Sequence, residues 1–223
     1  MNLIRKGILT VTGSFACAIL GMLTQMILTR KLMPEGMGQY QVFFDTGTLA
    51  VTLATLGLGA ASVYYINRKK RQAVSVVMNG LYWWFFCSIA LVIALCVIVK
   101  TFSGYFGELP FLAILGYAVG MTGILLINLL RPVLEAALRM TEVVIVTTAL
   151  PAAYLILVAL LALTGQLWVG TAIVAIAFGY VISAVVLLFF LRKDISLRCG
   201  FSFTLFRDMF IYGLKLFTSK SRL

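Results

Sequence analysis

Residues 143–191 read VVIVTTALPAAYLILVALLALTGQLWVGTAIVAIAFGYVISAVVLLFFL, and no charged side chain interrupts them. A helix needs about 20 apolar residues to cross the hydrocarbon core of a bilayer. The stretch is therefore too long for one crossing and long enough for two. Gly165-Gln166 is the natural break, because glycine interrupts regular structure. The stretch predicts two membrane-spanning helices, Val143–Leu163 and Trp168–Leu191.

The rest of the chain has the same apolar character. Of its 223 residues, 62% are apolar and 11% are charged, whereas soluble domains are about half apolar and a quarter charged. Long continuous apolar runs indicate helices, because strands of a membrane barrel would alternate in polarity. Four further runs complete an all-α, six-transmembrane-helix bundle: Ile8–Thr29, Tyr40–Ile66, Val76–Val99 and Pro110–Leu130.

The basic residues indicate how the helices are oriented. The net charge is +11, with 18 Lys and Arg against 7 Asp and Glu. Fifteen of the 18 fall at the N-terminus or in the second, fourth and sixth connections. The other side holds only Arg30, Lys31 and Lys100. Because cytoplasmic loops are enriched in Lys and Arg, both termini are expected in the cytoplasm. This placement suits membrane topology, and nucleic acid is not an expected partner.

Asp45 is the least expected residue within a span. A carboxylate at membrane depth costs about 2–3 kcal/mol on insertion scales, so it should face protein or water. It is a candidate cation or proton site, or a group that orients substrate. The alternative is a helix cap, or a side chain bonded to Gln41 or Thr46.

Three other polar residues are candidates for facing a cavity. Arg131 and Glu135 are four apart and can pair on one helix face, which Arg139 would continue. A guanidinium suits phosphate, although an ordinary solvated ion pair explains the same pattern. Gln25 and Asn128 either line a hydrophilic path or bond across helices.

The sequence offers no chemistry beyond these groups. It contains no His, no nucleophile–base pair and no Cys-x-x-Cys spacing among its four cysteines. Gly116 and Gly120 form a G-x-x-x-G pair that favours close helix packing. No catalytic residue, metal or cofactor is expected, and the chain is not expected to be an enzyme.

Two segments carry a resemblance to a known family. Residues 30–40 follow the pattern Arg-x-Leu-x-Pro-Glu-x-x-Gly-x-Tyr, and the next helix carries Leu56-Gly57-Leu58-Gly59. Phe206–Leu216 is similar to the entry into a seventh helix. Together they resemble the polysaccharide (Wzx-like) oligosaccharide flippases of the MATE/MOP superfamily. The motif residues are Arg30, Pro34, Glu35, Gly38 and Tyr40.

The resemblance implies the N-terminal lobe of a two-lobed transporter. Residues 1–194 would form a six-helix transmembrane lobe, and residues 195–223 a cytoplasmic connection and the incomplete start of a second lobe, with a truncated seventh helix. Such a transporter flips polyprenyl-pyrophosphate-linked oligosaccharide across the plasma membrane for cell-surface polysaccharide biosynthesis. The chain is expected to be a truncated form of it.

The same resemblance implies a location and partners. The location is the bacterial plasma (inner) membrane, and the partners are membrane lipids, lipid-linked oligosaccharide, a second half-transporter, or a polysaccharide polymerase and assembly proteins. Two alternatives stay open. One is a MATE-like ion-coupled exporter of small molecules, with Asp45 as the coupling carboxylate. The other is a non-transporting membrane assembly partner.

Overall fold

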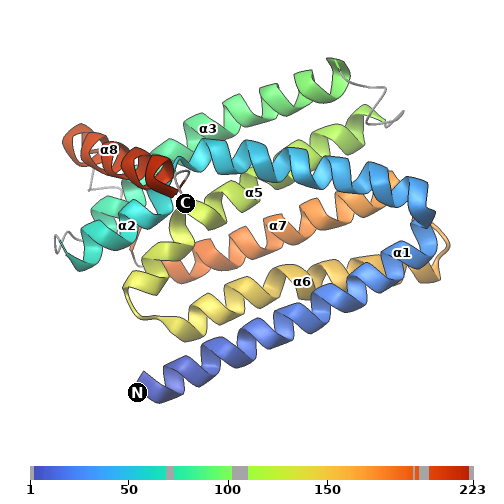
Figure 1. The fold of residues 1–223 in the computed structure, drawn as a ribbon, viewed down its shortest axis with the longest axis horizontal. Helices are drawn as coiled ribbons and strands as arrows, with labels where there is room; N and C mark the ends of the chain where they lie inside the picture. The colour runs from blue at the N-terminus through green and yellow to red at the C-terminus, as the bar shows by residue number, and fades with distance from the viewer. Residues whose placement is uncertain (1–2, 69–72, 102–109, 193, 196–200, 221–223) are drawn as a thin grey trace.

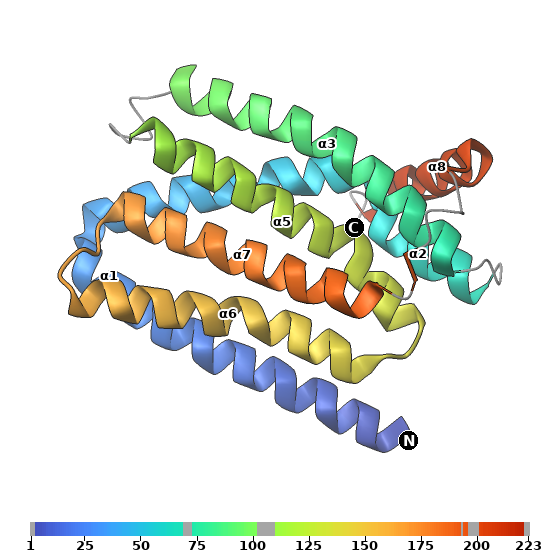
Figure 2. The ribbon, with the colours of Figure 1, turned by 180° about the vertical axis from the view of Figure 1, so that it is seen from behind.

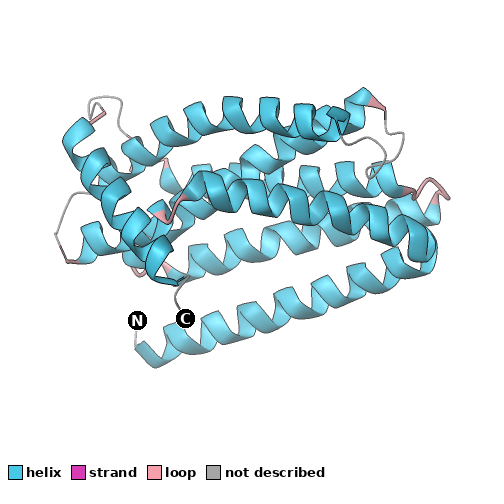
Figure 3. Ribbon diagram, turned by 45° about the horizontal axis from the view of Figure 1, so that its top comes forward, coloured by secondary structure: helices cyan, strands magenta, loops and turns pink. Residues whose placement is uncertain are grey.

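The computed structural model describes residues 3–68, 73–101, 110–192, 194–195 and 201–220. Every regular element in these residues is a helix (Figure 3). The predicted all-α fold class is therefore confirmed. The helices are α1 (Leu3–Thr55), α2 (Leu58–Asn67), α3 (Ala73–Thr101), α5 (Phe111–Ala136), α6 (Met140–Leu163), α7 (Val169–Leu191) and α8 (Phe203–Lys220).

The first predicted span, and the second as far as Thr55, form two helical arms of α1 that are joined at the non-helical residue Met33. At about 1.5 Å per residue, α1 would be about 80 Å long if straight, far more than one bilayer crossing. Met33 instead adopts φ 57° and ψ 173°, and Pro34 follows it. The chain consequently turns back at this point, and the two arms of α1 diverge from the turn (Figure 1). We call residues 3–32 the first arm and residues 34–55 the second arm.

The predicted span Tyr40–Ile66 is wrong as a single helix. Leu56 and Gly57 both have positive φ, 42° and 74°, and end α1 before α2 begins. The break frees backbone carbonyls at the end of α1, which need other donors. Trp83 of α3 supplies one, because its indole nitrogen donates to the carbonyl of Ala54 at 3.0 Å.

The remaining predicted spans agree with α3, α5, α6 and α7 to within a few residues, apart from the C-terminal end of α5. The break at Gly165 is confirmed as a turn with φ 72°. Within the described residues, five helices are long and apolar enough to cross a membrane, and the first of these contains both arms of α1. The start of α1, the α5–α6 turn and the end of α7 gather at one end of the bundle (Figure 1). The Met33 and Gly165 turns lie at the other.

Helices α5 and α7 form the centre of the bundle. Figure 2 shows α3, α5, α7 and α6 in one layer, with α1 behind it. Gly120 lets α5 approach α7 closely, because a Cβ built there would lie 2.3 Å from the Cβ of Ala177. The first arm of α1 packs on α6, where Gly13 contacts Val144.

Helix α8 packs on α2 and α3. Asn79 exchanges two hydrogen bonds with the backbone of Ser202, at 3.1 and 3.4 Å. The rings of Tyr64 and Tyr212 stack with their centroids 4.3 Å apart. The division at residue 194, with a second lobe beginning in this segment, stays a prediction.

Candidate functional site

A hollow with several polar side chains lies between the first arm of α1 and helices α5, α6 and α7. Its volume is about 440 Å³. It is lined by residues near the end of α5 and the start of α6, so it lies towards the end of the bundle that holds the α5–α6 turn. We call it the polar pocket. The residues with polar side chains that line it are Thr10, Ser14, Cys17, Asn128, Arg131, Glu135, Thr147, Tyr180 and Ser183.

Arg131 provides the positive charge of the polar pocket. Its Nε lies 2.9 Å from Oε1 of Glu135, and both side chains remain partly exposed, at 40% and 35%. The predicted pairing of these residues is confirmed. Only Nε takes part in this ion pair, so the two terminal nitrogens of the guanidinium keep donors that can bind an anion.

Asn128 lies one helical turn from Arg131 on the same wall. Its side chain is exposed in the polar pocket and makes no hydrogen bond within the described part of the chain. A free amide offers both a donor and an acceptor, which suits hydroxyl groups. Asn128 and Arg131 are the two predicted candidates that the fold brings together.

The opposite wall carries hydroxyl groups. Ser183 is buried and donates to the carbonyl of Val146 at 2.7 Å. Thr147 donates to the carbonyls of Val143 and Val144 in its own helix. Both hydroxyls donate their hydrogen to backbone carbonyls, and their oxygen lone pairs can still accept hydrogen bonds.

Tyr180 and Ser183 line the polar pocket but were not predicted from the sequence. Both lie in the most apolar span, where nothing in the local composition separates them from core residues. Their spacing of three residues, which places them on one helix face, is the signal that could have found them.

The end of α5 positions Arg131 and Glu135 in the polar pocket. The helix continues through Pro132 to Ala136, so Arg131 and Glu135 lie on one continuous face. The chain then reverses at Leu138, which has φ 55°.

The expectation that Arg139 continues this face is wrong, because the reversal removes it from the helix. Arg139 instead forms ion pairs with Glu142 at 2.6 Å and Asp194 at 2.7 Å. Partial burial disfavours its charge, but these partners outweigh burial and raise the pKa of Arg139. It also donates to the carbonyl of Phe190 at 2.8 Å. Arg139 thus joins the α5–α6 turn to the end of α7 beside the polar pocket.

Asp45 and Gln25 lie outside the polar pocket. Asp45 is exposed on the second arm of α1 and accepts a hydrogen bond from Gln41 at 3.0 Å. This geometry matches the simpler of its two predicted roles. Gln25 is exposed on the first arm, beside a shallow hollow that includes Met22 and Arg30.

The motif residues build the reversal of α1. Arg30, Pro34, Glu35 and Gly38 are exposed at this turn. Tyr40 is buried, and its hydroxyl accepts a hydrogen bond from the hydroxyl of Tyr154 at 2.8 Å. This bond attaches the second arm to α6, so Tyr40 has a structural role, and a role for the other motif residues stays a prediction.

Comparisons with solved structures identify the fold. A MATE transporter in complex with MaD3S is 18% identical, with a TM-score of 0.76 over 95% of this chain. A MOP superfamily transporter from Pyrococcus furiosus is also 18% identical, with a TM-score of 0.74 over 95% of this chain. An outward-facing multidrug resistance MATE transporter is 17% identical, with a TM-score of 0.76. The chain spans about half of the length of each of these transporters.

Sequence comparison identifies the family. No functionally curated protein matches the sequence. The family model described as "Polysaccharide biosynthesis protein" matches residues 3–222, nearly the whole chain. The expected resemblance is confirmed, and the chain belongs to this polysaccharide biosynthesis protein family.

Proposed function

We propose that this chain forms one wall of a pathway that moves a polyprenyl-pyrophosphate-linked oligosaccharide across the bacterial plasma membrane. The observation that carries the proposal is the polar pocket, where Arg131 and Asn128 present donors that make no hydrogen bond to any other described residue. Both termini would lie in the cytoplasm, as the distribution of basic residues predicts.

The side chains of the polar pocket suit the two chemistries of such a headgroup. The terminal nitrogens of Arg131 can donate to a pyrophosphate oxygen, in the forked geometry that guanidinium groups offer. Asn128 and the hydroxyls of Thr147 and Ser183 can exchange hydrogen bonds with sugar hydroxyls. Glu135 would hold Arg131 in position, because their ion pair fixes one edge of the guanidinium.

The solved transporters of this fold are about twice as long as the chain. We therefore propose that a second lobe completes the cavity opposite the polar pocket, supplied by a further segment or by a second half-transporter. Polysaccharide polymerase and assembly proteins are the other partners that this role would involve.

The fold by itself does not separate a flippase from a small-molecule exporter. The exporter alternative assigns ion coupling to Asp45, and the flippase proposal assigns headgroup binding to Arg131. These residues lie in different parts of the lobe, so separate variants distinguish the two proposals.

The test replaces the chromosomal gene with one encoding Arg131→Gln. Losing a hydrogen bond to a charged group costs about 1.5–3 kcal/mol, which is a tenfold or greater loss of function. We expect surface polysaccharide to fall about tenfold, and lipid-linked oligosaccharide to accumulate in the membrane. Immunoblotting of membranes checks that the protein level is unchanged.

Arg192→Gln is the matched control. Arg192 is exposed at the same end of the bundle, with its guanidinium carbon 4.4 Å from the ring centroid of Phe189. It does not line the polar pocket. Equal surface polysaccharide in the two variants would refute the role of Arg131. Increased drug sensitivity with normal polysaccharide would favour the exporter instead.

A further inference from the structure

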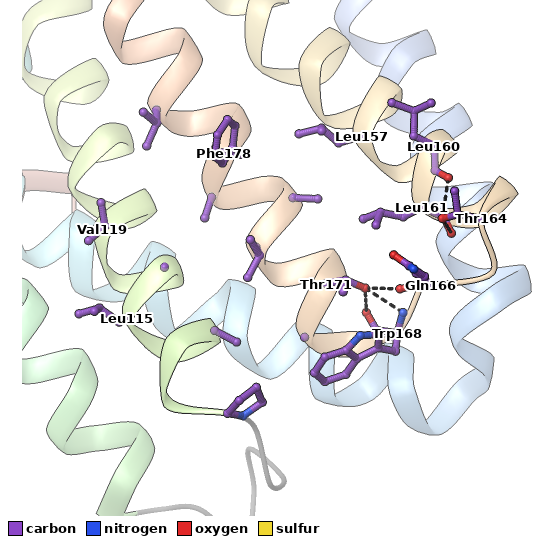
Figure 4. A pocket seen from close by; sticks show the side chains of 18 residues that line it. Leu115, Val119, Leu157, Leu160, Leu161, Thr164, Gln166, Trp168, Thr171 and Phe178 are labelled. Carbon is purple, nitrogen blue, oxygen red and sulfur yellow. Dashed lines mark hydrogen bonds between the residues drawn. The ribbon is translucent and has the colours of Figure 1, made fainter.

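A second hollow lies on the face of the bundle opposite α1, and we call it the apolar groove. Figure 4 shows it between α5 and α6, with α7 as its floor and α1 behind. Its volume is about 940 Å³. The middle of the groove is lined by Val119, Leu157, Leu160, Val174, Phe178 and Val181.

Helix α7 separates the apolar groove from the polar pocket. At about 100° per residue, Val174, Phe178 and Val181 lie within about 60° of one another around the helix. Tyr180 and Ser183 lie about 120° and 180° from Val174. Because α7 packs against both α5 and α6, a molecule in the polar pocket cannot extend into the apolar groove.

Among the described residues that line the apolar groove, those with polar side chains lie at one end. Thr164, Gln166, Trp168 and Thr171 surround the α6–α7 turn, where Figure 4 shows Thr171 bonded to the backbone of Gln166 and Trp168. The side-chain amide of Gln166 makes no hydrogen bond among the described residues. Trp168 is half-exposed at the first turn of α7, a position where indoles favour the membrane–water interface.

We infer that the apolar groove binds a phospholipid of the surrounding bilayer. One acyl chain lies along Val174, Phe178 and Val181, and the headgroup lies beside Gln166 and Trp168. The distribution of polar and apolar side chains supports this assignment. Polar groups lie beside Gln166 and Trp168, where we expect the membrane surface, and the groove becomes apolar towards Phe178 and Val181. A phospholipid has the same order of polar and apolar parts.

A neighbouring helix fits the apolar groove less well. Helix pairs in membranes pack through small residues that let backbones approach. Small residues such as Gly116 also line the groove, but its floor carries the exposed side chains of Val174 and Phe178, and the exposed fraction of Phe178 is 58%. Such protruding side chains keep a helix at a distance, whereas a flexible acyl chain can follow the spaces between them.

Gly116 offers a way to fill the apolar groove without disturbing the helices. A Cβ built at this position has one neighbour, Cγ2 of Val174 at the ordinary contact distance of 3.8 Å. Gly116→Leu should therefore fold normally and occupy the space of the acyl chain. Gly21→Leu is the matched control, because Gly21 is exposed on the first arm of α1 with nothing within 4 Å of its built Cβ.

The experiment uses the full chain in vesicles of phosphatidylethanolamine and phosphatidylglycerol, with a trace of phosphatidylethanolamine that carries a photoreactive group at the end of one acyl chain. After illumination, mass spectrometry locates the labelled peptides. We expect residues 157–181 to be labelled several-fold more than the lipid-exposed face of α3. Gly116→Leu should reduce this labelling several-fold, and Gly21→Leu should leave it unchanged.

Two results would overturn the inference. Labelling spread evenly over α3 and residues 157–181, or equal in the Gly116→Leu and Gly21→Leu proteins, would show no lipid site. Weak labelling of the groove together with cross-linked dimers that Gly116→Leu abolishes would assign the groove to a second copy of the chain. The readout does not depend on transport, so it stands apart from the proposed function.

Discussion

The polar pocket and the apolar groove share helices α5, α6 and α7, and they differ in the polarity of the side chains that line them. On one face of α7, Tyr180 and Ser183 border the polar pocket that holds Arg131. On the other face, Val174 and Phe178 form the floor of the apolar groove. The difference shows that position around the helix, and not the mean hydropathy of a span, decides which solvent or ligand a side chain meets.

The contact between α5 and α7 is common to both regions, so breaking it has the largest expected effect. Gly120→Val places a branched side chain where even a Cβ lies 2.3 Å from Ala177. Overpacking of this kind costs about 1–3 kcal/mol, or more where backbones cannot separate. We expect a large loss of folded protein in membranes and a lower unfolding temperature in detergent. Gly116→Val is the control with room for its side chain, and an equal loss in both would contradict this account.

An apolar substitution on the polar-pocket face of α7 should destabilise the protein more than a polar substitution on its apolar-groove face. Ser183→Val removes the hydrogen bond that the buried hydroxyl donates to the carbonyl of Val146, which lies within α6. The expected destabilisation is about 0.5–1.5 kcal/mol, the usual net contribution of one hydrogen bond. Phe178→Ser, on the exposed face, should cost less because few protein contacts are lost. Denaturation in a mixed-detergent series compares the two, and a larger effect of Phe178→Ser would reverse the assignment of the faces.

A substitution of Arg139 tests whether ion pairs stabilise the α5–α6 turn beside the polar pocket. Arg139→Ala removes ion pairs to Glu142 and Asp194 and the bond to Phe190. Because these groups are partly exposed, the expected cost is only about 1 kcal/mol. It should shrink as salt is added. An effect on the unfolding temperature that does not change with salt would show that packing, and not charge, holds the turn.

The smallest effect is expected at Asp45. Asp45→Asn keeps a side chain that can accept from Gln41, and the site is exposed. Stability should change by less than about 0.5 kcal/mol, as is usual for surface substitutions, and surface polysaccharide should stay at the wild-type level. Lost drug resistance in this variant would favour the ion-coupled exporter.

Much of the fold was predictable because membrane spans are encoded locally. The apolar runs located α3, α5, α6 and α7, and the turn at Gly165 followed from one residue. The joint between α1 and α2 was not predictable in this way. Leu56 and Gly57 lie within an apolar run, and Trp83 stabilises the break from another helix.

The candidate site was partly predictable. Arg131 and Asn128 stood out as polar residues in an apolar span, and the pairing of Arg131 with Glu135 followed from their spacing. Asp45 and Gln25 are also polar residues in apolar spans, but they lie on exposed faces of α1 outside the polar pocket. Polarity within a span identifies an unusual residue without saying which neighbour it faces.

The sequence alone determined the membrane class, most of the spans and the common side of the basic connections, because lipid solvation and charge act on short segments. The tertiary structure decided the rest. It placed Tyr180 and Ser183 with Arg131, moved Arg139 from the α5 face to the end of α7, and separated the polar pocket from the apolar groove. These arrangements depend on how the helices rotate and pack, and packing is a property of neighbours that are distant in the chain.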